Sequence, residues 1–230
     1  MAAQGPQLGM GANVCALHKA TAEDAVDEYV VIGAHRDHVG YGNFGSKGKK
    51  GEIHNGADDN ASGTSGLLEL ARVLSEKKLA LRRHVLIIHF DGEEKGLLGS
   101  EHYASAPLVP MEKTVAMLNM DMTGRNATNQ MQCGPEEDDR NPALQQILVK
   151  ISARFGIALP GEGMKQYMNR SDQWPFMRKG VPAIFLFGGM HGDYHTHNDD
   201  PEKLNYTKMA NIAKLTLLFA VEVAALEKRP

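Results

Sequence analysis

Acidic and histidine side chains gather in five loops of this sequence of 230 residues. The first loop is "GAHRDHVG", in which His35 ends an apolar run and Asp37 lies two residues further on. A histidine that binds a metal commonly donates its other ring N–H to a carboxylate, and the His-x-Asp spacing suits that pair. A surface histidine beside an aspartate has the same spacing, so this motif alone leaves both readings open.

The second loop, "HNGADDNASG", carries the adjacent carboxylates Asp58 and Asp59 at the start of a helix-like segment. Two neighbouring carboxylates repel each other, and a nearby cation would relieve that repulsion. The alternative is that Asp58, Asp59 or Asn60 simply caps the helix. The residues alone favour neither a metal ligand nor a cap.

The third and fourth loops each follow a strongly apolar run. In "HFDGEEKGLLGS" the adjacent pair Glu93 and Glu94 invites two roles, one carboxylate on a metal and the other free to move protons. A solvated acidic turn is the alternative. Asp121 in "LNMDMTGR" is a lone acid whose burial is costly unless it is paired or bound to metal, and Arg125 is the alternative partner.

The fifth loop, "GGMHGDYHTHNDDPEKLN", contains His191, His195 and His197, and nothing internal selects one of them as a ligand. Taken together, the five loops supply imidazoles and carboxylates in a mixture that suits Zn²⁺, with Mn²⁺ or Co²⁺ as substitutes. Two metals about 3.5–4 Å apart, bridged by one carboxylate, need this number of groups. The residues alone therefore predict a metal site, with several possible ligands in each loop.

The elements that position these loops alternate between strand-like and helix-like. We expect strands at residues 13–18, 28–35, 83–90, 114–121 and 182–188, and helices at residues 61–79, 97–106, 141–155 and 206–226. Strands separated by helices predict an α/β fold, a single three-layer domain with a mostly parallel mixed β-sheet flanked by helices on both faces. Ligands bind at the carboxyl ends of the strands in such sheets, where the five loops lie.

Composition excludes several other classes of protein. A net charge of -3 argues against nucleic acid as a partner, and the only basic run, residues 46–52, is Gly-rich and predicts a mobile, solvated loop. No apolar stretch approaches the roughly 18 residues of a membrane span, and the N-terminus lacks the pattern of a signal peptide, so we expect a soluble chain. We expect one catalytic domain over residues 1–230, with residues 1–12 a poorly ordered or truncated extension.

Five blocks resemble the zinc aminopeptidases of peptidase family M28. They are "DEYVVIGAHRDHVG", "GEIHNGADDNASGTSGLLELAR", "HFDGEEKGLLGSEHY", "TVAMLNMDMTGR" and "DYHTHNDDPEKLNY". Their order and separations fit the family from about Asn13 to about Leu226. The resemblance implies a zinc-exopeptidase fold and two Zn²⁺ per chain. His35 and Asp121 would complete the shell of one metal, Glu94 and His195 that of the other, and Asp59 would bridge the two.

The resemblance also separates residues that the sequence alone does not. The family's bridging Asp precedes Asp or Asn, which selects Asp59, and its last ligand stands before a Thr-x-x-Asp stretch, which selects His195. Glu93 resembles the general base, Asp37 the carboxylate behind the first histidine, and Tyr194 a residue that polarises the scissile carbonyl. Relatives commonly have His where this chain has Gln173, a position that binds no metal in the family.

The implied function is a metal-dependent aminopeptidase that hydrolyses N-terminal residues from peptides with a free N-terminus. A metal-bridging water activated by Glu93 would attack the peptide bond. The alternatives are a carboxypeptidase or a glutaminyl cyclase on the same fold, cyclases usually binding one zinc, or a non-catalytic binding module. Apolar side chains at residues 164–176 either line the substrate pocket or pack in the core. Side-chain preference, oligomeric state and compartment stay open, although relatives are often secreted or periplasmic.

Overall fold

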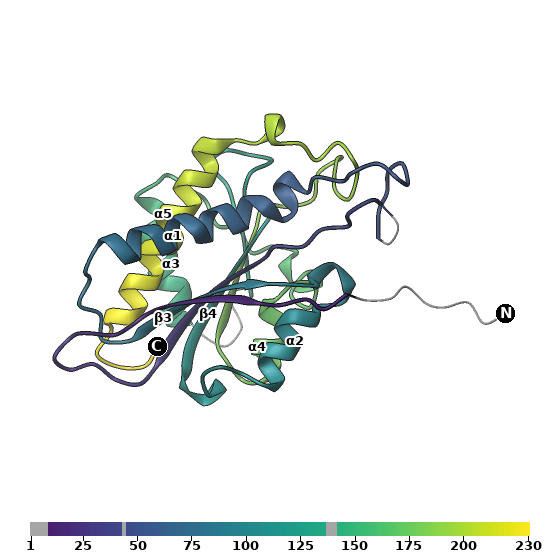
Figure 1. Ribbon diagram of the computed structural model, residues 1–230. Helices are drawn as coiled ribbons and strands as arrows, with labels where there is room; N and C mark the ends of the chain where they lie inside the picture. The colour runs from purple at the N-terminus through teal and green to yellow at the C-terminus, as the bar shows by residue number, and fades with distance from the viewer. Residues whose placement is uncertain (1–8, 43–44, 137–141) are drawn as a thin grey trace.

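The computed structural model describes residues 9–42, 45–136 and 142–230, which form a six-stranded sheet with helices on both faces (Figure 1). The strands are β1 (Val14–His18), β2 (Tyr29–His35), β3 (His84–Phe90), β4 (Thr114–Asp121), β5 (Gln132–Gly134) and β6 (Ala183–Phe187), in the order β1-β3-β2-β4-β6-β5. The four central strands run parallel, while β1 and β5 pair antiparallel at the two edges. The predicted mostly parallel mixed sheet is therefore confirmed.

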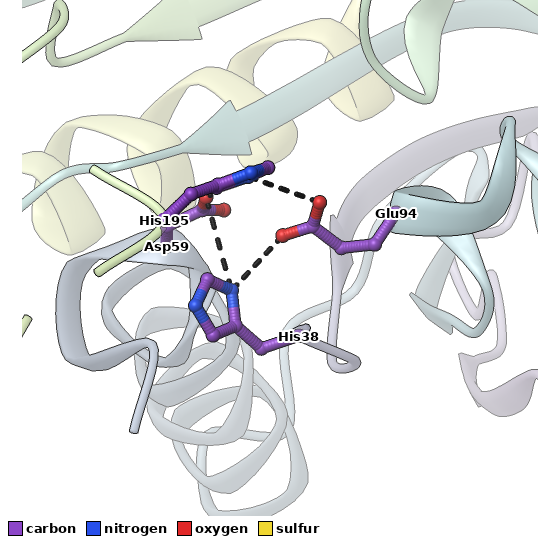
Figure 2. A group of neighbouring side chains, drawn as sticks. All are labelled: His38, Asp59, Glu94 and His195. Atoms are coloured by element: carbon purple, nitrogen blue, oxygen red, sulfur yellow. Dashed lines mark hydrogen bonds and ion pairs between the residues drawn. The ribbon is translucent and has the colours of Figure 1, made fainter. Parts of the chain in front are cut away.

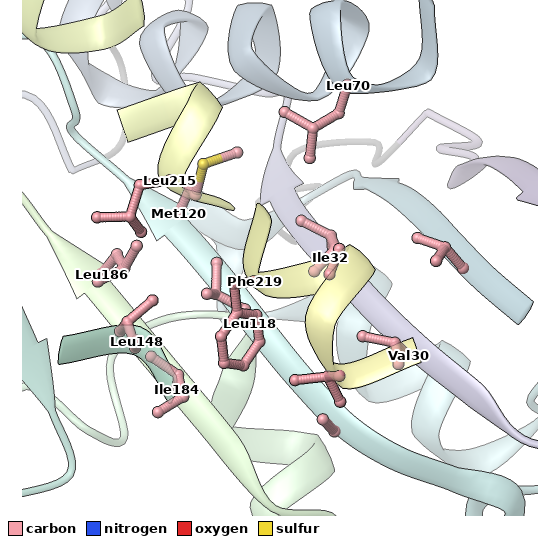
Figure 3. Close-up of a cluster of buried hydrophobic side chains, with 14 of the residues drawn as sticks. Val30, Ile32, Leu70, Leu118, Met120, Leu148, Ile184, Leu186, Leu215 and Phe219 are labelled. Carbon is pink, nitrogen blue, oxygen red and sulfur yellow. The ribbon is translucent and has the colours of Figure 1, made fainter. Parts of the chain in front are cut away.

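Two helical layers bury the two faces of this sheet. The first layer contains α1 (Gly63–Glu76), α3 (Pro142–Ala153) and α5 (Tyr206–Ala225), and the second contains α2 (Leu98–Ser105) and α4 (Gln173–Arg178). Alternate side chains of β2 serve the two layers. Val30 and Ile32 lie in one cluster with Leu70 and Phe219 (Figure 3), whereas Val31 lies in the cluster under α2 and α4. Burial on both faces explains why the central strands are continuous apolar runs.

The structure adds two elements to those expected, β5 and α4. Both are short, at three and six residues, and hydrophobic periodicity needs a longer window to become visible. Residue 141, the expected start of α3, and residues 1–8 of the expected extension lie outside the described residues. Among the residues that are described, no helix is both long enough and apolar enough to cross a membrane.

The carboxyl ends of the parallel strands β2, β3, β4 and β6 all lie at the same end of the sheet. The irregular turn η1 (Ala57–Ser62) precedes α1 at this end of the sheet, and the single turn η2 (Glu93–Lys95) follows β3 there. The long loop from Phe187 to the turn η5 (Pro201–Lys203) also starts at this end. The five chemically suggestive loops of the sequence therefore meet in one place.

Candidate metal centre

The five residues expected to bind metal converge beyond the carboxyl ends of the strands. His35 is the last residue of β2 and Asp121 the last of β4, so the sheet itself fixes their positions. Asp59 lies in η1, Glu94 in η2, and His195 in the loop after β6. Their side-chain atoms form two groups, each compact enough to hold one metal ion, and Asp59 belongs to both.

The first group contains His35, Asp59 and Asp121, and we call it the strand-end group. His35 Nε2 lies 3.3 Å from Asp59 Oδ1 and 3.5 Å from Asp121 Oδ1. The second oxygen of Asp121 accepts a hydrogen bond of 2.9 Å from the Ser171 hydroxyl, which leaves the first oxygen facing the histidine. The exposed fractions of the three residues are 1%, 3% and 7%, so the group is shielded from solvent.

The second group, the loop group, contains His38, Asp59, Glu94 and His195 (Figure 2). His195 Nε2 lies 3.1 Å from Asp59 Oδ2 and 3.0 Å from Glu94 Oε2. His38 Nδ1 lies 2.9 Å from Glu94 Oε1. Sequence reasoning missed His38, although the signal was present as a second imidazole in "HRDH".

Backbone groups of the Gly-rich loop hold His195 in its orientation. His195 Nδ1 lies 2.8 Å from the Gly45 carbonyl oxygen, and the Lys47 N–H donates to the His195 carbonyl at 2.8 Å. Because Nδ1 is bound to Gly45, Nε2 is directed at the two carboxylates. The lysines at positions 49 and 50 are exposed, as expected of a solvated loop, but the start of the loop has this structural contact.

The other two histidines of the crowded loop face elsewhere. His191 Nε2 lies 3.3 Å from Asp58 Oδ2, away from the cluster, and His197 Nε2 lies 3.6 Å from Glu52. Asp58 accepts the Gly124 N–H at 2.5 Å. The geometry therefore places Asp59 and His195 in the cluster, and Asp58, His191 and His197 outside it.

Asp37 fixes the turn that carries Glu93 and Glu94. Its two carboxylate oxygens accept the backbone N–H groups of Glu93 at 3.0 Å and Glu94 at 3.2 Å. The contact of His35 Nδ1 is with the backbone oxygen of Asp37, at 3.1 Å, while the carboxylate lies 3.8 Å away. The expected link between His35 and Asp37 thus runs through the backbone, and the carboxylate orients the Glu-Glu pair.

Burial and crowding shift the protonation of these groups. Burial, together with the carboxylates of Asp172, Asp121 and Glu94, raises the pKa of Glu93 well above its usual range despite the attraction of His35. Although burial disfavours a charged ring, the carboxylates of Asp59 and Glu94 raise the pKa of His195 to about 10. Carboxylates this close and this buried repel one another, and a cation among them would relieve that repulsion.

Unpaired buried atoms indicate where that charge belongs. Asp59 Oδ2, Asp121 Oδ1 and His195 Nε2 are buried and lie close to charged groups, but none of them makes a well-aligned hydrogen bond. Such atoms are rare in folded proteins, and one metal ion in each group would satisfy them. Imidazole with carboxylate is a donor set typical of Zn²⁺. The residues present therefore fit a metal centre.

A cleft of about 150 Å³ opens onto the strand-end group. Its walls include Met122, Tyr167, Phe185, Phe187 and Met190, with Glu93 and Tyr194 beside the metal groups. Of the apolar residues at 164–176, only Tyr167 lines this cleft. Phe185 and Phe187 belong to the expected strand at residues 182–188. The sequence does not show that the carboxyl end of this strand borders a cavity.

Two more expected residues lie close to the cluster. The ring of Tyr194 stacks on His195 with centroids 3.8 Å apart, and burial raises the pKa of its phenol, so the hydroxyl stays protonated. Gln173 is fully buried behind Asp121, where its amide accepts from Asn119 at 3.0 Å and donates to the Met168 carbonyl at 2.8 Å. It is not among the residues that line the cleft.

The chain is similar in sequence to known peptidases. The model of peptidase family M28 matches residues 13–220. A probable leucine aminopeptidase from Trichophyton verrucosum is 33% identical over 206 residues, which cover 86% of this chain and 55% of that protein. The chain therefore spans about half the length of this curated relative.

Solved structures share the fold. An aminopeptidase from Aneurinibacillus sp. strain AM-1 has a TM-score of 0.75 and 31% identity, covering 93% of this chain and 48% of that one. BSAP, a zinc aminopeptidase from Bacillus subtilis, has a TM-score of 0.74 and 24% identity, covering 95% and 51% of the two chains. A glutaminyl cyclase from Porphyromonas gingivalis shares the fold at 22% identity, so the fold alone does not decide the reaction.

Proposed function

This chain belongs to peptidase family M28, and from that premise we propose that it is a two-zinc aminopeptidase acting on peptides with a free N-terminus. The observation that carries the proposal is the pair of ligand groups that share Asp59, beside a cleft that Glu93 also lines. The aminopeptidase names of the relatives support this reaction. The second ligand group disfavours a glutaminyl cyclase, for which one zinc is expected.

In this proposal the two ligand groups divide between two ions. His35 and Asp121 would hold one, Glu94 and His195 would hold the other, and Asp59 would serve both, since its Oδ1 faces His35 and its Oδ2 faces His195. Bound zinc would acidify a water molecule and polarise the scissile carbonyl. The protein fixes the ligand positions through the strand ends and through the loops that contact Glu94 and His195.

Glu93 is the proposed general base. Its Oε2 lies 4.0 Å from His35 Nε2, beside the strand-end group, and Asp37 anchors its backbone. Bound zinc beside Glu93 would favour its ionised form, and Oε2 would then take a proton from the attacking water and return it to the nitrogen of the leaving amine. Glu93 is free for this role because Glu94, its neighbour, supplies the ligand oxygen to the loop group.

The cleft binds the N-terminal residue of the peptide. Its aromatic and methionine walls suit an apolar side chain, and about 150 Å³ allows little more than one such side chain. The carboxylates at its base attract a protonated α-amine, which a blocked N-terminus lacks. The protonated Tyr194 hydroxyl is placed to donate to the carbonyl oxygen of the scissile bond.

The proposal is tested with aminoacyl p-nitroanilides, N-blocked peptides and peptides with N-terminal Gln. We expect hydrolysis of the unblocked substrates only, with activity lost to a chelator and restored by Zn²⁺. Glu93→Gln should lower kcat by about 10²–10⁴-fold while zinc content stays the same, because the general base alone is removed. Cyclisation of N-terminal Gln without hydrolysis, or an unchanged kcat in the variant, would contradict the proposal.

A further inference from the structure

His38 is the one side chain of the loop group that has no role in the mechanism above. Its side chain is only 9% exposed, and its Nδ1 contacts Glu94 Oε1 at 2.9 Å. The other carboxylate oxygen, Oε2, lies 3.0 Å from His195 Nε2. Glu94 therefore has one imidazole on each of its oxygens, as Figure 2 shows.

The ring of His38 and the chain next to it are held in this position. Gly56 has a φ of 60°, and a Cβ added there would lie 2.5 Å from His38 Cγ and 2.7 Å from Cδ2, so the ring occupies space that a side chain would fill. The preceding residue, Asp37, accepts hydrogen bonds from the backbone of the Glu93–Glu94 turn, which fixes the chain next to His38. Asp37 and His38 thus contact the same turn: Asp37 accepts from the backbone of the turn, and His38 contacts the side chain of Glu94.

The count of ligands shows what this contact does. Catalytic zinc sites have three protein ligands and keep one position open, whereas four protein ligands close the site. Asp59, His195 and one oxygen of Glu94 make three. A second oxygen of Glu94, or a nitrogen of His38, would occupy the position that substrate needs. Since a carboxylate only accepts, the Nδ1–H of His38 donates to Oε1 and withholds that oxygen from the ion.

We propose that His38 is a positioning residue that keeps Glu94 a one-oxygen ligand, through Oε2, in the loop group. The inference rests on the proposed function, because it requires a metal ion between Asp59, Glu94 and His195. It predicts that His38 contributes to the affinity for this ion without contacting it. Hydrogen-bond partners of metal ligands commonly change metal affinity by about 10–100-fold.

The test compares His38→Ala with His38→Asn in the full chain, because the Asn side-chain N–H₂ takes the place of Nδ1–H but brings no ring. Zinc affinity is measured by competition with a chromophoric chelator, and folding by thermal melting of the metal-free chains. We expect His38→Ala to weaken one of two zinc ions by about 10–100-fold and leave the other unchanged. His38→Asn should restore most of the loss.

A cobalt spectrum separates positioning from direct coordination. With Co²⁺ in place of zinc, His38→Asn should keep the ligand-field absorption of the parent chain, since no ligand is lost. If His38→Asn had a changed spectrum and a zinc affinity as low as that of His38→Ala, His38 would be a metal ligand. If His38→Ala bound zinc as tightly as the parent chain, His38 would only pack against the turn. Either result overturns the proposal. Glu94→Gln tests the loop group itself: we expect this variant to keep one tightly bound zinc ion, and a chain that still binds two would refute the loop group.

Discussion

The two ligand groups share Asp59 but differ in what supports them. In the strand-end group, His35 and Asp121 are the last residues of two neighbouring parallel strands. Pairing of His35 with β3 and of Asp121 with β6 fixes their backbones. In the loop group, Glu94 lies in a single turn and His195 in a loop, where its φ is 60°. The strand-end group is thus supported by a rigid sheet, whereas the loop group depends on contacts between loops.

The largest effect is expected where the two groups meet. Asp59→Ala removes the carboxylate that belongs to both, so we expect zinc content below one ion per chain. Zinc contributes several kcal/mol to the transition state, and hydrolysis should fall on the order of 10³-fold or more. Metal analysis and kcat/KM measure the two quantities. A chain that keeps two tightly bound ions would show that the groups do not depend on this bridge.

Stepwise metal removal tests the difference in support. We expect a chelator to remove one ion at a concentration at least about tenfold below that needed for the other, and the weaker ion to be that of the loop group. His195→Ala should then retain the tight ion, whereas Asp121→Asn should lose it. Zinc content after dialysis at rising chelator concentration gives the answer. The reverse assignment would mean that the loops bind more firmly than the strand ends.

Asp199 ties the His195 loop to the bridging residue. It is fully buried, and its Oδ2 accepts the backbone N–H groups of Asp58 and Asp59, both at 3.0 Å. Asp199→Ala leaves these two donors unpaired, so we expect about 1–3 kcal/mol less free energy of unfolding for the metal-free chain. Both zinc affinities should fall roughly tenfold, because Asp59 serves both ions.

The control for that prediction is Asp199→Asn, which keeps an oxygen acceptor in the same place. Urea unfolding and zinc competition on the two variants give the comparison. Weakening confined to the loop group would show that Asp199 acts on the His195 loop and not through Asp59.

The sequence indicated the positions of His35 and Asp121 more directly than those of the loop group. His35 and Asp121 each end a continuous apolar run. Such a run predicts a strand that is buried on both faces, and the polar residue after it marks the end of the strand. His195 needed the family resemblance to separate it from His191 and His197. What selects it physically is a contact with Gly45, 150 residues earlier, and no local pattern records such a contact.

The same reason explains the other omissions. His38 acquires its role only when the loop at Gly56 and the turn at Glu94 close around it. The carboxylate of Asp37 was expected to contact His35. It accepts hydrogen bonds from the backbone N–H groups of Glu93 and Glu94 instead and lies 3.8 Å from His35 Nδ1. In the fold, the central strands and long helices were predictable, and the short β5 and α4 were not.

The smallest expected effect comes from the loop that orients His195. A Cβ at Gly48 would lie 3.0 Å from His197 Nδ1 and 3.1 Å from His54 Nε2, so Gly48→Ala should shift the loop by a few tenths of an ångström. The neighbouring Lys47 N–H and the Gly45 carbonyl would then hold His195 less well. We expect affinity for the loop-group ion to fall about twofold to fivefold, below 1 kcal/mol, with the strand-end ion unaffected.

Gly192→Ala is the matched control for this variant. Gly192 lies three residues before His195 and would place its Cβ with no atom within 4 Å, so it should leave both affinities unchanged. Zinc competition resolves a difference of this size when the two variants are measured side by side. If Gly48→Ala weakened both ions equally, the loop would support the whole centre, and the contrast between a strand-supported and a loop-supported metal would no longer hold.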